Sequence, residues 1–184
     1  MDTKVILIHG NGGGTHESFW LPYVTSGLEK LGLAVIAKDF PDSKLARAEY
    51  WLPYIKELGA DENTILVGYS SGAIAAMRYA ENNPILGSVL VSTYYTDLGE
   101  EDEKLSGYFN SPWNWEKIRN NQKWIVQFSS VDDPWIPIGE ARFIHNVLGT
   151  QYFEYTDQGH FGLPVDKREF PEIIESIKKH LEIT

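Results

Sequence analysis

The chain has 184 residues, of which 42% are hydrophobic and 13% aromatic, and this predicts one globular domain over residues 1–184. Its formal net charge of -10 disfavours nucleic acid as a partner, because phosphate binding relies on lysine and arginine displacing counterions. The absence of cysteine excludes disulfides and thiolate metal sites and fits a reducing, cytoplasmic compartment. No apolar run reaches the roughly 18 residues of a membrane helix, and the N-terminal run is too short for a signal peptide, so we expect no membrane association.

Short apolar runs rich in β-branched residues alternate with longer amphipathic segments along the chain. This alternation predicts a parallel sheet covered by helices. The expected strands are 4–8, 34–38, 64–67, 88–91, 124–128 and 152–155. The expected helices are 19–31, 45–58, 72–81, 115–120, 138–147 and 171–181. Pro53 is expected to kink or restart the second helix.

The first expected strand is followed directly by the glycine-rich stretch HGNGGG, residues 9–14. A glycine-rich loop in this place can hold a phosphate or dinucleotide, or it can present backbone N–H groups to another ligand. The stretch lacks both the G-x-G-x-x-G spacing and the G-K-[ST] ending. The sequence therefore disfavours phosphate binding at this loop.

The third expected strand leads into Gly68-Tyr69-Ser70-Ser71-Gly72, which matches G-x-S-x-G and precedes an alanine-rich expected helix. In a nucleophile elbow the serine lies on a tight strand-to-helix turn, and the small glycines let strand and helix approach each other. We identify Ser70 as the candidate nucleophile and the backbone N–H of Ser71 as a candidate oxyanion donor. The pentapeptide alone is only suggestive, because a tight turn of small packing residues gives the same pattern.

The longest irregular stretch of the pattern, 93–114, contains the acidic run GEEDE followed by SGYFNSPWNW. A connection of this length inside a compact domain favours a lid or a binding loop over a plain crossover. A solvated surface excursion is the alternative interpretation.

A serine hydroxyl becomes a strong nucleophile only when a base removes its proton and a carboxylate orients that base. The fifth expected strand is followed by SSVDDPWIP, where Asp133 is the preferred acid because Pro134 biases it to an extended backbone. Asp132 is the alternative. The sixth expected strand is followed by TDQGHFG, where Gly159 permits a sharp turn and His160 is the candidate base.

The remaining histidines are not arranged as in a known metal motif such as H-E-x-x-H. We therefore expect no metal site and no cofactor. In hydrolases with a G-x-S-x-G elbow, the loop after an earlier strand supplies a second oxyanion N–H, and residues 9–14 are suitably placed for this role. Asn11 is the candidate donor, with Gly12 as the next choice.

Several longer segments of the chain match a known family. They are GNGGG at 10–14, WLP at 51–53, SSGAIAAMRYAE at 70–81, SGYF at 106–109, WEKI at 115–118, IVQF at 125–128, DDP at 132–134 and GHF at 159–161. Through them nearly the whole sequence resembles the retinoblastoma-binding protein 9-like family of small serine hydrolases. The resemblance implies a minimal α/β-hydrolase fold, a three-layer αβα sandwich with six mostly parallel strands in the order 2-1-3-4-5-6 and no full cap domain. It also implies a Ser-Asp-His triad, whose motifs fall on Ser70, Asp133 and His160.

These observations predict a serine hydrolase that cleaves small carboxylic esters or amides through an acyl-enzyme, with such a small molecule as its partner. The alternative is a protein-interaction module on a hydrolase fold with little turnover. Binding to a retinoblastoma-type pocket is doubtful because its L-x-C-x-E motif corresponds here to residues 58–62, where Ala60 replaces the cysteine. We therefore do not predict a retinoblastoma-type pocket protein as a partner.

Overall fold

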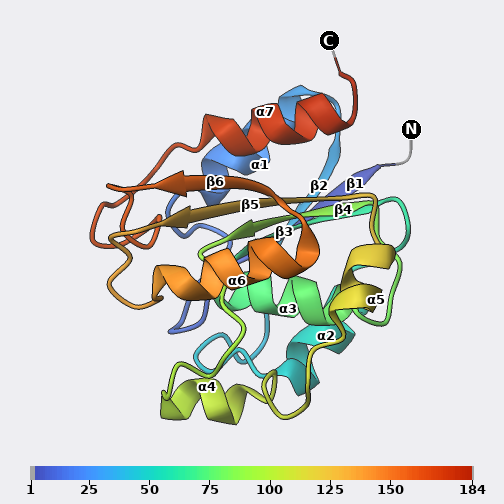
Figure 1. The fold of residues 1–184 in the computed structure, drawn as a ribbon. Helices are drawn as coiled ribbons and strands as arrows, with labels where there is room; N and C mark the ends of the chain where they lie inside the picture. Colours follow the sequence, from blue (N-terminus) through green and yellow to red (C-terminus); the bar gives the residue numbers. More distant parts are fainter. Residues whose placement is uncertain (1–2, 184) are drawn as a thin grey trace.

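The computed structural model describes residues 3–183, which form a single six-stranded sheet flanked by helices (Figure 1). The strands are β1 (Lys4–Ile8), β2 (Ala34–Ala37), β3 (Thr64–Tyr69), β4 (Gly87–Val91), β5 (Trp124–Ser130) and β6 (Gln151–Tyr155). The helices are α1 (Leu21–Lys30), α2 (Ala48–Glu57), α3 (Ser71–Ala80), α4 (Glu101–Ser106), α5 (Trp115–Asn120), α6 (Ile138–Leu148) and α7 (Pro171–His180). The order β2-β1-β3-β4-β5-β6 confirms the prediction, and all neighbouring strands are parallel.

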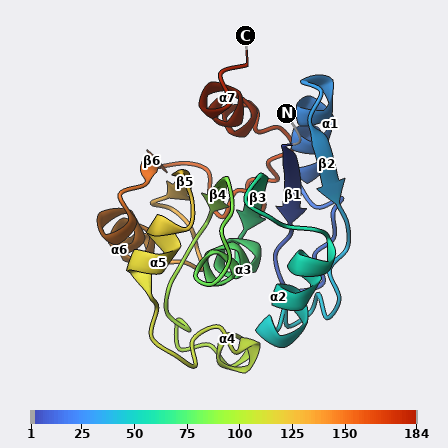
Figure 2. The ribbon, with the colours of Figure 1, turned by 90° about the vertical axis from the view of Figure 1, so that its right-hand side faces the viewer.

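Helices cover both faces of the sheet, which confirms the predicted three layers. Figure 2 shows α1 and α7 on one face and α2, α3, α5 and α6 on the other. Successive side chains of β1 alternate between the two cores: Val5 and Leu7 pack on the α1 and α7 side, whereas Ile6 and Ile8 pack on the α3 side. Because both faces are covered, β3 and β4 are buried along their whole length and read as continuous apolar runs.

Several predicted helix boundaries were wrong. Helix α1 begins at Leu21 rather than at residue 19, because Phe19 has a φ of 51° that a helix cannot include. Helix α2 begins at Ala48 rather than at residue 45, because Ala46 has a φ of 54°. Helix α2 does not restart at Pro53 but runs through it, and the carbonyl of Glu49, which loses its helical N–H partner there, lies at an exposed residue. None of the helices within residues 3–183 is long and apolar enough to cross a membrane.

The stretch predicted to be irregular, 93–114, contains the short helix α4. Three acidic residues occupy its first turn, where they complement the helix dipole, and Gly107 ends it in the left-handed conformation. Helix α4 lies beyond the α2 and α3 layer, on the outside of the molecule (Figure 2). It was missed because a helix this short does not produce a readable hydrophobic period.

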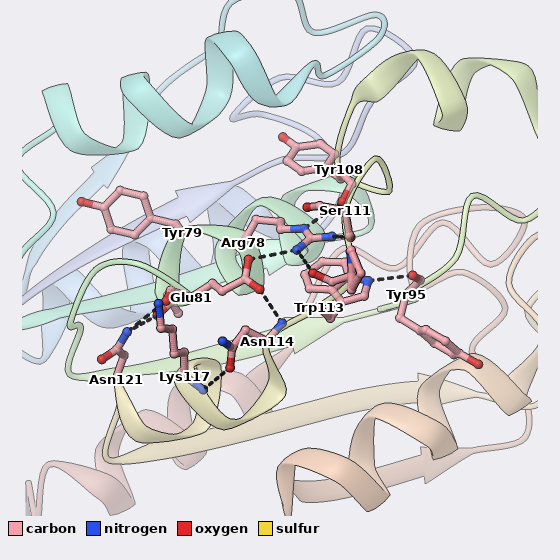
Figure 3. Close-up of polar contacts among 12 residues, drawn as sticks. Arg78, Tyr79, Glu81, Tyr95, Tyr108, Ser111, Trp113, Asn114, Lys117 and Asn121 are labelled. Atoms are coloured by element: carbon pink, nitrogen blue, oxygen red, sulfur yellow. Dashed lines mark hydrogen bonds and ion pairs between the residues drawn. The ribbon is translucent and has the colours of Figure 1, made fainter.

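Arg78 of α3 fixes the second half of this stretch (Figure 3). Its guanidinium lies 3.6 Å from the ring centre of Trp113 and pairs with Glu81 at 2.9 Å. Glu81 in turn accepts the backbone N–H of Asn114. The guanidinium also donates to the carbonyl oxygens of Tyr108, Ser111 and Pro112. A buried charge with this many partners holds 108–114 firmly against α3.

Candidate active site

Ser70 lies on a sharp turn between β3 and α3. It is the one residue between the end of the strand at Tyr69 and the start of the helix at Ser71. Its φ of 55° and ψ of -120° belong to a region that side-chain-bearing residues rarely occupy. Such a conformation persists only where the surroundings enforce it, and it projects the side chain out from the carboxyl edge of the sheet.

Gly68 and Gly72, on either side of Ser70, must be glycine because backbone atoms occupy the space that a Cβ would need. A Cβ on Gly68 would lie 2.3 Å from the carbonyl oxygen of Gly72. A Cβ on Gly72 would lie 2.3 Å from the carbonyl oxygen of Ile8 and 2.6 Å from that of His9. The glycines thus allow tight packing and form the strand-to-helix turn at the same time. The packing interpretation and the elbow interpretation of G-x-S-x-G are therefore compatible.

The structure brings Ser70, His160 and Asp133 into one hydrogen-bonded chain. The Nε2 atom of His160 lies 3.0 Å from Ser70 Oγ, and its Nδ1 atom lies 2.7 Å from Asp133 Oδ2. The side chains of His160 and Asp133 are 9% and 3% exposed. Because the carboxylate can only accept, Nδ1 carries the proton, and Nε2 is left to accept from the serine hydroxyl.

Each partner of Ser70 is held by its own surroundings. The second oxygen of Asp133 accepts the backbone N–H groups of Trp135 and Ile136 at 2.9 and 3.0 Å. The imidazole of His160 lies between the rings of Tyr69 and Trp135, with centroid distances of 5.3 and 5.0 Å. Burial raises the pKa of Tyr69, and the nearby Asp133 raises it further, so this ring stays neutral. These contacts fix the orientation of both side chains before any substrate arrives.

The alternative acid, Asp132, does not contact His160. Its Oδ1 accepts the hydroxyl of Ser130 and, at 2.9 Å, the backbone N–H of Gly159. The hydrogen bond from Ser130 lowers the pKa of Asp132, so the carboxylate remains ionised. Asp132 therefore links the turn after β5 to the turn that carries the histidine.

Of the two predicted oxyanion donors, Asn11 lines the same cavity as Ser70, and Ser71 follows Ser70 directly in the chain. Within residues 3–183, the backbone N–H groups of Asn11 and Ser71 have no hydrogen-bond acceptor. Gly12, the second choice for a donor, already uses its N–H on the carbonyl oxygen of Lys44 at 3.0 Å. The backbone N–H groups of Asn11 and Ser71 are therefore free to donate to a ligand, whereas that of Gly12 is not.

A cavity of 710 Å³ opens in front of these groups. The glycine loop forms one wall, and Ser70 and His160 lie at the same cavity. Its lining includes the acidic residues Glu100, Asp102 and Glu103 and the apolar residues Trp135 and Leu163.

Glu103 is a site residue that the sequence analysis missed. Its carboxylate accepts Asn11 Nδ2 at 3.0 Å and the hydroxyl of Tyr94 at 2.8 Å, although the residue is only 9% exposed. Burial raises its pKa, while the two hydrogen bonds lower it. An acidic run such as GEEDE usually indicates a solvated surface, so no sequence signal pointed to a buried carboxylate.

The family model described as alpha/beta hydrolase family matches residues 5–172. The chain belongs to the alpha/beta hydrolase family. Serine hydrolase RBBP9 of Rattus norvegicus is 46% identical, covering 97% of this chain and 96% of its own, which confirms the resemblance to the RBBP9-like serine hydrolases. We therefore describe the chain as a hydrolase.

Solved structures show the same fold at low sequence identity. The ydeN gene product of Bacillus subtilis has a TM-score of 0.88 and 22% identity, with 98% of this chain and 99% of that one covered. Est1E of Butyrivibrio proteoclasticus, solved with ferulic acid, has a TM-score of 0.72 and 15% identity, with 98% and 88% covered. This alpha/beta hydrolase has, within its described residues, no group of three or more acidic or histidine side chains placed to hold a metal ion.

His9 shapes the start of the glycine loop. Its Nδ1–H donates to the carbonyl oxygen of Gly10 at 2.8 Å, and its Nε2 accepts the backbone N–H of Phe40 at 2.9 Å. Burial lowers the pKa of His9, although the Gly10 carbonyl and Asp39 oppose this effect. A proton on Nε2 would point at the backbone N–H of Phe40, so the hydrogen bonds of His9 require the neutral imidazole.

We expect Gly72→Ala to lower the free energy of unfolding by about 1–3 kcal/mol, because the new methyl group overlaps the rigid backbone at the end of β1. Urea denaturation measures this. Gly139→Ala is the matched control, since a Cβ there meets nothing within 4 Å, and it should leave stability unchanged or raise it by about 0.5–1 kcal/mol. Equal stability of the two variants would contradict the close-packing account.

We expect His9 to make stability depend on pH in the acidic range. The pKa of His9 in the folded protein lies below its unfolded value of about 6.5, so the unfolded chain binds a proton more readily. The stabilisation of the fold by neutral His9 is therefore complete above that pH and is lost as the pH falls. Urea denaturation at about pH 7.5 and about pH 5.5 should therefore show a larger loss for the wild type than for His9→Gln. The same loss in both proteins would show that His9 is not responsible.

Proposed function

We propose that the enzyme hydrolyses small carboxylic esters or amides through a covalent acyl-enzyme. The observation that carries this proposal is the chain of contacts from Ser70 Oγ to His160 at 3.0 Å and from His160 to Asp133 at 2.7 Å. Ser70 is the nucleophile, His160 is the general base and then the general acid, and Asp133 orients the imidazole and stabilises its cationic form.

In the first half of the reaction, His160 takes the hydroxyl proton as Ser70 Oγ attacks the substrate carbonyl carbon. The carbonyl oxygen becomes negatively charged and accepts the backbone N–H groups of Asn11 and Ser71. When this intermediate collapses, the bond to the alcohol or amine breaks, and His160 returns the proton to the leaving group. The acyl group then remains on Ser70 as an ester.

In the second half, water replaces the leaving group. His160 Nε2 takes a proton from the water as its oxygen attacks the acyl carbon, and the same two N–H groups hold the oxyanion. Collapse of this intermediate releases the carboxylic acid and returns the proton to Ser70. The cycle needs only water as a co-reactant.

The cavity limits the substrates that fit. A volume of 710 Å³ is in the range of small-molecule pockets. Glu100 and Asp102 line it, and the chain has a formal net charge of -10, so an anionic substrate is repelled on approach. Small neutral esters are therefore favoured over anionic ones as first substrates to test.

We expect a fluorophosphonate probe to label the wild-type protein covalently, and Ser70→Ala to abolish the labelling. Gel fluorescence or intact-mass measurement reads out the adduct. Ser26→Ala is the matched control because this serine lies exposed on α1, outside the residues that line the cavity, so the variant should still label. A well-folded wild type that takes no label would instead favour an interaction module with little turnover.

We expect Asp133→Ala to lower kcat/KM on an activated neutral ester by about 10²- to 10⁴-fold, because the histidine loses its orienting carboxylate. Asp132→Ala loses only the contacts to Ser130 and Gly159, and we expect a loss of no more than about 10-fold. Steady-state kinetics on both variants decides the assignment. A larger loss in Asp132→Ala would reassign the acid.

A further inference from the structure

We propose that Glu103 is a positioning residue for the oxyanion hole: its buried carboxylate fixes the Asn11 side chain and connects it to the first residue of α3. The proposal rests on the function proposed above. It concerns a residue of α4, the helix that the sequence did not predict, and it assigns a role to part of 93–114.

The loop after β1 is held by backbone N–H groups of Gly12 and Gly13, which donate to carbonyl oxygens of residues 43–44, but it has few side chains. Between residues 10 and 14 every residue except Asn11 is glycine. Gly12 and Gly13 have φ values of 69° and 86°, and a Cβ at either one would meet nothing within 4 Å. Asn11 therefore provides the one side chain through which this stretch can be held, and Glu103 Oε1 accepts its Nδ2–H at 3.0 Å.

The second oxygen of the carboxylate reaches the other oxyanion donor. Glu103 Oε2 accepts the hydroxyl proton of Tyr94 at 2.8 Å. Because that proton is already used, Ser71 Oγ, 3.2 Å from the Tyr94 oxygen, is the donor in its contact with Tyr94. One carboxylate thus connects the side chains of Asn11 and Ser71, whose backbone N–H groups form the proposed hole.

The environment of Glu103 fits a positioning role better than an ion-pair role. Among residues 3–183, no lysine, arginine or histidine lies within 4.0 Å of its carboxylate. A carboxylate offers two acceptor oxygens and no proton, so it accepts both neighbours at once. Leaving the hydroxyl of Tyr94 unpaired would be costly, because Tyr94 is buried.

The helix that carries Glu103 is itself supported. Helix α4 is followed by Tyr108 and Ser111, whose carbonyl oxygens accept hydrogen bonds from the buried guanidinium of Arg78 (Figure 3). Arg78 belongs to α3, the helix that begins at Ser71. The stretch 93–114 follows β4 and contacts both ends of α3, through Tyr94 at Ser71 and through Tyr108 and Ser111 at Arg78. It is therefore anchored to the helix that follows Ser70.

The test is a double-mutant cycle between Glu103 and Asn11, measured as kcat and KM on an activated neutral ester. Asn11→Ala keeps the backbone N–H but loses the held side chain. We expect Glu103→Ala and Asn11→Ala each to lower kcat by about 10- to 100-fold with KM within about 3-fold, the size of a misplaced oxyanion donor. The double variant should lose little more than either single variant, because both break the same contact.

Three outcomes would overturn the proposal: an unchanged kcat in Asn11→Ala, losses that multiply in the double variant, or an effect on KM alone. The first of these needs no change at Glu103, so it stays decisive even if Glu103→Ala fails to fold. Glu101→Gln is the control for charge on the same helix, because this exposed residue contacts only Lys104, and its kcat should stay within about 2-fold.

A second variant, Glu103→Gln, separates the hydrogen bond to Asn11 from the negative charge of Glu103. In Glu103→Gln the amide oxygen can still accept Asn11 Nδ2–H, and the amide N–H can donate to Tyr94 once its hydroxyl rotates. We expect this variant to lose less than about 5-fold in kcat, well below the loss in Glu103→Ala. A loss as large as that of the alanine variant would show that the negative charge matters rather than the held side chain, and would overturn the proposal.

Failure of the inference differs from failure of the proposed function. If Ser70→Ala is inactive while Glu103→Ala matches the wild type, the triad mechanism stands and Glu103 has no positioning role. If Ser70→Ala hydrolyses the ester as fast as the wild type, the proposed function fails, and the inference that rests on it fails too. Thermal unfolding of each variant shows whether a lost kcat reflects a lost fold.

Discussion

The site depends on how closely backbone approaches backbone at the turn after β3. Gly72 lies so near the carbonyl oxygens of Ile8 and His9 that no side chain fits between α3 and the end of β1. Ser70 adopts its unusual φ and ψ next to this close approach, and Gly10 of the glycine loop lies near the Ser70 side chain. One steric constraint therefore brings α3, the end of β1 and the candidate nucleophile together.

The parallel sheet completes the arrangement. Because all six strands run the same way, the turns after β1, β3, β5 and β6 meet at one edge, and residues far apart in sequence become neighbours. Short polar contacts then fix the details: Asp132 bonds to the N–H of Gly159, and Asp133 bonds to His160. The two adjacent carboxylates thus do different things, one holding the turn and the other holding the ring.

Much of this could be predicted from the sequence, and the failures have physical reasons. Buried parallel strands read as apolar runs, so the strands could be predicted. The G-x-S-x-G, DDP and GHF motifs pointed to Ser70, Asp133 and His160, which lie in contact in the structure. The starts of α1 and α2 were wrong because positive φ values at Phe19 and Ala46 leave no mark on hydrophobic periodicity. Glu103 was missed because burial of one carboxylate in an acidic run depends on distant partners.

Buried polar groups fix the stretch 93–114 next to the candidate site. Removing the Glu103 carboxylate and the Arg78 guanidinium from water is unfavourable, and each is compensated by hydrogen bonds to groups that also need partners. An apolar contact could stabilise the same stretch, but it would not fix the direction of the Asn11 carboxamide. Directional bonds give a defined position to a glycine loop that has almost no side chains of its own, and an oxyanion hole depends on such a defined position.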